Sequence, residues 1–133
     1  CIRDRMEIRF LIEPSIAAMA AIRADETDIK NILTACENTE KLLLANKNHA
    51  EKDIAFHTAI ALSSKNIVVP KLVPIINSSI PLIRESAKFT MRDETIEIHR
   101  EIADAIAAHD AVRAHDAMYL HLIYNRKHIK SIN

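Results

Sequence analysis

Hydrophobic and polar positions follow a helical period along almost the whole chain. Apolar residues recur three and four positions apart, a spacing that places them on one face of an α-helix. Breaks in this pattern separate six expected helices, at residues 2–23, 25–45, 51–64, 66–88, 93–108 and 110–130. Asp25 and Asp110 stand where a carboxylate would cap the second and the last of them. The pattern therefore predicts an all-α fold, an antiparallel bundle of about six helices joined by short connections.

Prolines fall inside two of the expected helices. Pro14 lies within the first, and Pro70, Pro74 and Pro81 lie within the fourth. Proline lacks a backbone N–H and crowds the preceding turn, so we expect the first and fourth helices to be kinked.

The overall composition supports a single helical domain. At 133 residues, of which 49% are hydrophobic, the chain can bury one core. Glycine is absent and aromatic residues make up only 4%, whereas strand-rich folds usually need glycine turns and aromatic strands. Eighteen basic residues balance eighteen acidic ones, so this segment lacks the basic excess that contacts with DNA phosphates require.

Cysteine usage and hydropathy indicate a cytoplasmic protein. Cys1 and Cys36 show neither CxxC spacing nor the density of a secreted disulfide scaffold, and a buried, idle thiol is expected at Cys36. The chain has no run of about 18 apolar residues and no signal-peptide pattern, so neither membrane insertion nor secretion is predicted. Because the chain begins at Cys rather than Met, we expect further sequence upstream.

Polar residues with metal-ligand chemistry lie on the inward faces of three expected helices. In the stretch "EKDIAFHTAIALSS", Asp53 and His57 are one helical turn apart on the face that carries the apolar residues. His99 lies within an apolar stripe of the fifth helix, and His121 lies within one of the sixth. Solvated side chains are expected at the histidines in polar segments: His49, His109 and His128.

An apolar bundle would have difficulty in satisfying these four groups without a shared partner. Each histidine alone is more often a hydrogen-bonded core residue than a ligand, but buried polar groups need compensation. A divalent metal would supply that compensation by accepting three neutral imidazoles and one carboxylate. We expect zinc or nickel first, while manganese, iron and copper are also compatible with this donor set.

Four motifs that occur in order resemble a known family. They are "MEIRFLIEPSIAAMAAIRA", "DIAFHTAIALSSKN", "EIHREIADAI" and the pattern A-x-x-A-M-x-x-H-L at residues 114–122. Together they resemble the FCD domain, the effector-binding C-terminal half of FadR-subfamily GntR transcription regulators. With six helices rather than seven, the chain is similar to the shorter, VanR-like type, and residues 1–133 are expected to form one such domain.

The resemblance implies a function as well as a fold. It implies an antiparallel helical bundle, a homodimer, and a pocket for a small carboxylate effector beside a metal. The family's metal ligands fall here on Asp53, His57, His99 and His121. It also implies a winged-helix domain upstream, through which the full-length protein would bind DNA.

Arginine is the natural partner for a carboxylate effector. Arg9 falls at the arginine of the E-x-R motif, and its guanidinium could pair bidentately with a carboxylate. A surface salt bridge with Glu7 or Glu13 is an equally good interpretation of the same residue. Further candidates for effector binding lie on the proline-rich helix: Asn77, Ser78 and Arg84.

Two departures from the family and two alternative functions remain. The family often has glycine where this chain has Lys65 and His109, so we expect those turns to be shaped differently.

Three histidines and a carboxylate could also activate water in a mononuclear metalloenzyme. The chain lacks HExxH and an obvious general base, so no catalytic residue is predicted. In the second alternative, the histidines only hydrogen-bond within a metal-free dimerisation module.

Overall fold

The structure, a computed structural model, describes residues 1–87 and 92–130, apart from the side chains of residues 84–87, 128 and 130. All regular secondary-structure elements within these residue ranges are helices. They are α1 (Ile2–Arg23), α2 (Glu26–Leu44), α3 (Ala50–Ser63), α4 (Val69–Ala87), α5 (Arg92–Ala107) and α6 (Ala111–Lys130). This confirms the predicted all-α class and the six expected segments.

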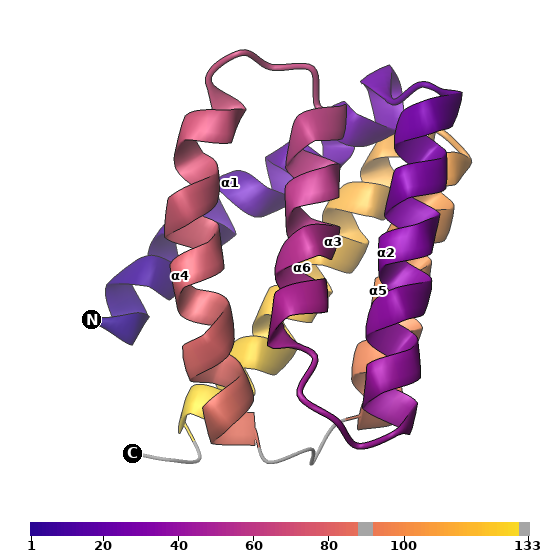
Figure 1. The fold of residues 1–133 in the computed structure, drawn as a ribbon. Coiled ribbons are helices and arrows are strands. Elements are labelled where there is room, and N and C mark those ends of the chain that lie inside the picture. Colours follow the sequence, from indigo (N-terminus) through magenta and orange to yellow (C-terminus); the bar gives the residue numbers. More distant parts are fainter. Residues whose placement is uncertain (88–91, 131–133) are drawn as a thin grey trace.

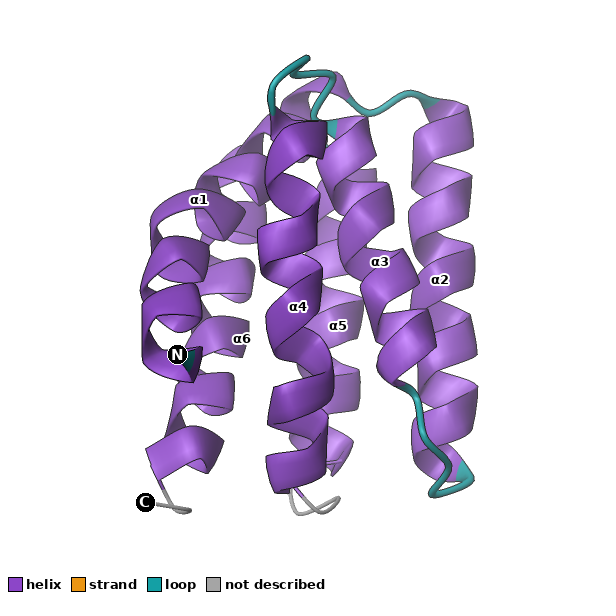
Figure 2. Ribbon diagram, turned by 60° about the vertical axis from the view of Figure 1, so that its left-hand side comes forward, coloured by secondary structure: helices purple, strands orange, loops and turns teal. Residues whose placement is uncertain are grey.

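The helices form an antiparallel bundle of two layers. Figure 1 shows α2, α3 and α4 side by side, with α5 and α6 behind them, and Figure 2 shows the same order from another side. Helix α1 packs along α6 and also contacts α3, α4 and α5, while α2 contacts α5. Helix α3 therefore lies in the middle of one layer, where its inward face meets side chains from α1, α5 and α6.

The helix boundaries follow from local side-chain chemistry. Asp25 begins α2 with a capping box, in which its side chain accepts a hydrogen bond from Asp28 N at 2.8 Å. Pro14 lies inside the continuous α1, and Pro74 and Pro81 lie inside α4. The kinks expected at these prolines stay a prediction.

Two turns keep a backbone shape that glycine adopts most easily. Lys65, after α3, has φ 54°, and His109, before α6, has φ 57°. Both angles are in the left-handed region, which costs a residue with a Cβ about 1–2 kcal/mol. Lys65 Nζ pairs with the Asp28 carboxylate at 2.7 Å, and His109 Nδ1 hydrogen-bonds the carbonyl of Ala21 at 2.8 Å. Such contacts help to offset the strain, and the expectation that these turns differ in shape from those of the family stays a prediction.

The core is built mainly from isoleucine and alanine, together with a few larger side chains. Its members include Phe56, Ile60, Ile102, Ile106 and Met118, all at most 1% exposed. Cys36 is a free thiol and is buried in the same cluster, as predicted. The core surrounds a group of buried polar residues at the centre of the bundle.

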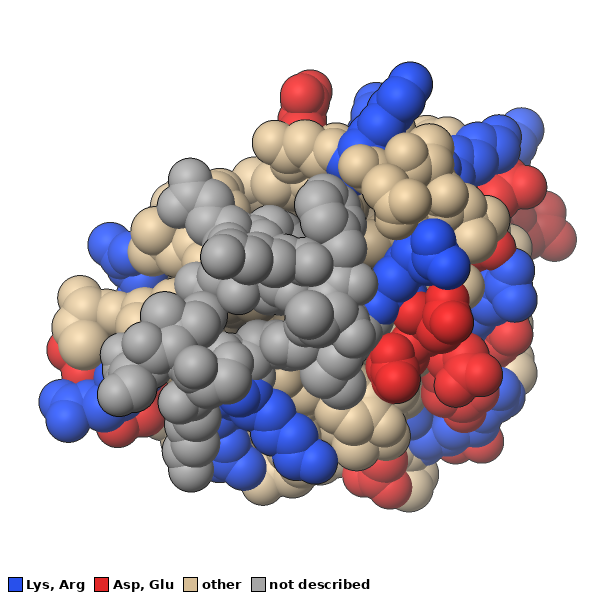
Figure 3. Space-filling model, turned by 90° about the horizontal axis from the view of Figure 1, so that it is seen from below, with Lys and Arg blue, Asp and Glu red and all other residues tan. Residues whose placement is uncertain are grey.

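The outer surface carries both signs of charge. On the face seen in Figure 3, Lys and Arg side chains are interspersed with Asp and Glu. The chain as a whole has no net charge when histidine is neutral. Within the described residues, no helix is both long enough and apolar enough to span a membrane.

Candidate metal centre

The four predicted ligands converge at the centre of the bundle. Helix α3 supplies Asp53 and His57, α5 supplies His99, and α6 supplies His121, and all four side chains are buried. Each histidine offers a ring nitrogen, and these three atoms lie within 4.8 Å of one another. Asp53 Oδ1 lies 3.5 Å from Nε2 of both His57 and His99. Helices distant in sequence thus bring one carboxylate and three imidazoles together.

Packing limits how far the imidazole rings can turn. The ring centroid of His121 lies 5.2 Å from that of His57 and 4.9 Å from that of His99. The ring of Phe56, which is fully buried, lies 4.8 Å from the His99 ring. Close packing of this kind confines side chains to few rotamers, so the three histidines are held near one another by the fold itself.

A buried carboxylate from α1 adjoins the centre. One carboxylate oxygen of Glu13 accepts a hydrogen bond from Arg9 Nε at 2.6 Å, and the other oxygen lies 2.6 Å from His57 Nδ1. Arg9 Nη1 in turn donates to Ser79 Oγ on α4 at 3.1 Å. These side chains are at most 3% exposed, and they connect α1, α3 and α4 at the core.

Electrostatic interactions shift the pKa values of the buried groups at the centre. Burial alone would raise the pKa of Glu13, but the charges of Arg9 and His57 lower it to about 2. Burial alone would lower the pKa of His57, but Glu13 and a hydrogen bond to Asp53 raise it to about 9. The pKa of His121 falls well below its ordinary value, because of burial and the two neighbouring histidines. A protonated His57 beside a neutral His121 avoids the repulsion of several clustered cations.

The donor set fits a divalent metal ion. A zinc–imidazole bond is about 2.1 Å long, so any two nitrogens bound to one ion are separated by at most about 4.2 Å. The three histidine nitrogens, within 4.8 Å of one another, are already close to that range. Asp53 contributes a negative charge beside them that would partly neutralise the ion.

Comparison with known families identifies the domain. The sequence profile of the FCD domain matches residues 4–123. The chain belongs to the FCD domain family. Its homologues are GntR-family transcription regulators, which confirms the predicted resemblance.

Individual relatives of this FCD domain share its sequence at moderate identity. The HTH-type transcriptional regulator YcbG of Bacillus subtilis is 29% identical over 93% of this chain and 52% of its own length. The galactonate operon transcriptional repressor of Escherichia coli is 33% identical over 78% of this chain and 47% of its own length. The chain thus spans about half the length of the curated relatives it matches.

A solved structure shares the fold. The structure of Streptococcus agalactiae GntR superposes with a TM-score of 0.83 at 34% sequence identity. The match covers 95% of this chain and 58% of that one. The six-helix arrangement is therefore that of GntR effector-binding domains.

The residues predicted to bind an effector in this FCD domain differ in their burial and in their hydrogen-bond partners. Arg9 pairs with Glu13, as one interpretation had it, but the pair is buried rather than on the surface. Its Nη2 atom is also buried and makes no hydrogen bond within the described part of the chain. Asn77 is half-buried on α4, whereas Ser78 is exposed and donates to the carbonyl of Ile75. The side chain of Arg84 lies outside the described residues.

Sequence reasoning missed three residues that border the centre. Glu13 was considered only as a surface partner, although its position four residues after Arg9 is the helical signal for a pair. Ser79, next to the candidate Ser78, turns inward instead. Asn125, one turn after His121, places its amide nitrogen 3.5 Å from His121 Nε2. Spacing on a single helix could have found Glu13 and Asn125, but only the fold selects Ser79.

One histidine outside the centre differs from its prediction. His49 is 5% exposed, at the start of α3, rather than solvated in a polar connection. His109 is exposed as expected, and the side chain of His128 lies outside the described residues. His49 Nδ1 lies 3.4 Å from the carbonyl oxygen of Lys47 in the turn between α2 and α3.

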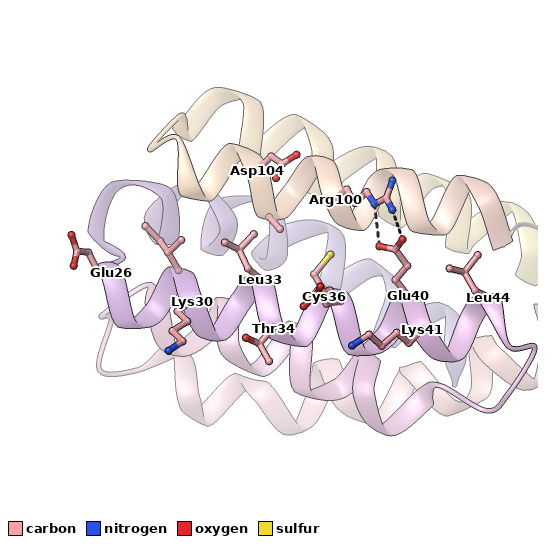
Figure 4. A pocket seen from close by; sticks show the side chains of 13 residues that line it. Glu26, Lys30, Leu33, Thr34, Cys36, Glu40, Lys41, Leu44, Arg100 and Asp104 are labelled. Atoms are coloured by element: carbon pink, nitrogen blue, oxygen red, sulfur yellow. Dashed lines mark hydrogen bonds and ion pairs between the residues drawn. The ribbon is translucent and has the colours of Figure 1, made fainter.

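The FCD domain also has an outer groove of about 820 Å³ between α2 and α5. Figure 4 shows the side chains of Leu33 and Cys36 on α2, which line the groove, and the ion pair between Arg100 on α5 and Glu40 on α2. None of the four predicted metal ligands lines this groove. It is therefore separate from the candidate centre.

Proposed function

We propose that this FCD domain is the ligand-sensing part of a bacterial GntR-type transcription regulator. It binds a divalent metal through Asp53, His57, His99 and His121, and a small carboxylate effector binds beside the metal. The observation that carries the proposal is the cluster of three buried histidine nitrogens within 4.8 Å, adjacent to a buried carboxylate. Buried groups of this kind are costly in an apolar core unless they share a partner.

The donor set favours zinc or nickel in this centre, with manganese, iron and copper as weaker candidates. Three imidazoles and one carboxylate suit zinc and nickel equally well. On a six-coordinate ion, four protein donors leave two positions to which an effector carboxylate could bind. Zinc in tetrahedral geometry would instead be closed by the four protein ligands.

Arg9 is the best-supported partner for the effector. Its Nη2 lies buried near the centre while Nε and Nη1 are engaged by Glu13 and Ser79. A carboxylate would therefore meet Nη2 rather than the whole guanidinium fork. Asn77 has a buried side-chain oxygen that could accept a hydrogen bond from an effector hydroxyl, and Ser78 and Arg84 remain weaker candidates.

The names of two relatives support an acidic effector. One is named as the repressor of a galactonate operon, and another is named as a putative regulatory protein of an L-lactate dehydrogenase operon. Galactonate and lactate both carry a carboxylate next to a hydroxyl group. We infer that the effector of this domain belongs to the same chemical class.

The whole protein acts on DNA as a homodimer in the cytoplasm. A winged-helix domain upstream of this segment makes the DNA contacts, in agreement with the balanced charge of the segment itself. The effector can regulate only through a difference in its affinity for two arrangements of the dimer.

Metal titration of the purified chain tests the proposal. We expect stripped protein to bind one zinc or nickel ion per chain, and His99→Ala to weaken binding by roughly 100-fold or more, since losing even an outer partner of a ligand costs about 10–100-fold. Asp53→Asn, which preserves side-chain shape, should weaken it as well. His115→Ala is the matched control, because His115 is exposed on α6.

Two results would contradict the proposal. Absence of metal binding, with no effect of His99→Ala, would leave a hydrogen-bonded dimerisation module. Turnover of lactate or galactonate by the metal-loaded protein would favour an enzyme instead.

A further inference from the structure

One carboxylate, that of Glu13, contacts both the predicted metal site and the predicted effector anchor. Its Oε1 lies 2.6 Å from Nδ1 of His57, and its Oε2 accepts from Nε of Arg9 at 2.6 Å. Glu13 is 3% exposed, so water does not compete for either oxygen. A short, buried and charge-assisted contact of this kind strongly restrains both partners.

The contact decides which nitrogen of His57 is left for an ion. A carboxylate only accepts hydrogen bonds, so Nδ1 of His57 carries the proton that is donated to Glu13. The other nitrogen, Nε2, lies 3.5 Å from Asp53 Oδ1, on the side of the predicted centre. The geometry therefore presents Nε2 to the other three ligands.

We propose that Glu13 is a positioning residue, which holds the His57 ring with Nε2 toward the metal and is itself held by Arg9. Histidine ligands ordinarily donate their second N–H to a carboxylate or carbonyl, which orients the ring and makes it a better donor. Here that partner comes from α1, and Arg9 extends the chain of contacts to Ser79 on α4. The inference rests on the metal-binding function proposed above.

The test compares metal affinities of the stripped chain, with zinc and nickel as separate probes in competition with a chromophoric chelator. Glu13→Gln should weaken binding by about 10–100-fold. Glu7→Gln is the matched control, because Glu7 is exposed on the same helix, and it should bind as the unmodified chain does. Urea unfolding of the metal-free variants measures separately what the substitution costs the fold.

A double-mutant cycle distinguishes positioning from a general structural role. In a His57→Ala background, Glu13→Gln should weaken metal binding no further, because its effect passes through the His57 ring. The same loss in both backgrounds would overturn the inference. If Glu13→Gln binds metal with the same affinity as the unmodified chain, only this inference is overturned. If the unmodified chain binds neither ion, the proposed function and this inference are overturned together.

A second test uses only the unmodified chain, so its outcome does not depend on whether a variant folds. Long-range ¹H–¹⁵N correlation spectra of the zinc-loaded protein should show His57 protonated at Nδ1 and metal-bound at Nε2. Metal binding through Nδ1 would overturn the inference, because that nitrogen could not then donate to Glu13.

Discussion

Polar side chains at the centre of this bundle are buried as completely as the isoleucines around them. Arg9 and Asp53 are both 0% exposed, the same as Ile102. Burial of an ion pair is costly, and loss of one partner of a buried pair costs about 3–5 kcal/mol. The short contacts from Glu13 to Arg9 and His57 supply the compensation that each group needs. At the scale of single residues, the centre is a connected network rather than a set of separate ligands.

The two cysteines should differ in reactivity. Burial raises the pKa of the Cys36 thiol to about 11, with a further contribution from the charge of Glu40, whereas Cys1 is exposed. Because the thiolate is the reactive form, we expect iodoacetamide at pH 8 to modify Cys36 at least about 10-fold more slowly than Cys1. Mass spectrometry of peptides over time measures both rates. Unfolding in urea should make them similar, and equal rates in the native protein would contradict the prediction.

Helix ends are where local chemistry determines this fold most directly. Asp25 and Asp28 each accept a hydrogen bond from the other's backbone N–H, which satisfies two donors at the start of α2. Lys65 and His109 hold turns in a left-handed conformation through contacts with other helices. Elements therefore begin by local rules, but some of the turns between them depend on tertiary contacts.

Removal of the cap should destabilise α2 measurably. Asp25→Ala loses the side-chain acceptor of the capping box, so we expect the melting temperature to fall by a few degrees. Asp25→Ser retains a capping oxygen and should stay close to the unmodified protein. Glu37→Ala, at an exposed interior position of α2, is the control, and circular dichroism during heating is the measurement. An equal effect of Asp25→Ala and Glu37→Ala would argue against the cap.

At the scale of the whole molecule, two neighbouring helices keep apolar side chains in solvent. Helix α1 exposes Leu11 at 73% and Ile8 at 38%, and α4 exposes Ile75 at 39% and Leu82 at 38%. The two helices contact each other at one side of the bundle (Figures 1 and 2). Exposed apolar side chains on neighbouring helices are common at protein interfaces. We therefore expect this side to meet a second copy in the proposed homodimer.

A charge on this side should weaken the dimer. Leu11→Asp would place a carboxylate in the interface, and we expect the dimer dissociation constant to rise roughly 10-fold or more. Val112→Asp is the matched control, because Val112 is equally exposed at 73% but lies at the start of α6. Sedimentation equilibrium measures both. A dimer that is weakened by Val112→Asp and not by Leu11→Asp would place the interface elsewhere.

The amino-acid sequence alone determined the helices and their inward faces. Apolar spacing is a local property, so it gave the six segments and put Asp53, His57, His99 and His121 on sides that face the core. Metal binding at these residues stays a prediction.

The tertiary structure decided how the faces meet, because contacts between distant helices leave no local pattern. It placed Glu13 against His57, forty-four positions away. One residue is about 100° around a helix, so the packing of α4 against α1 turned Ser79 rather than Ser78 toward Arg9.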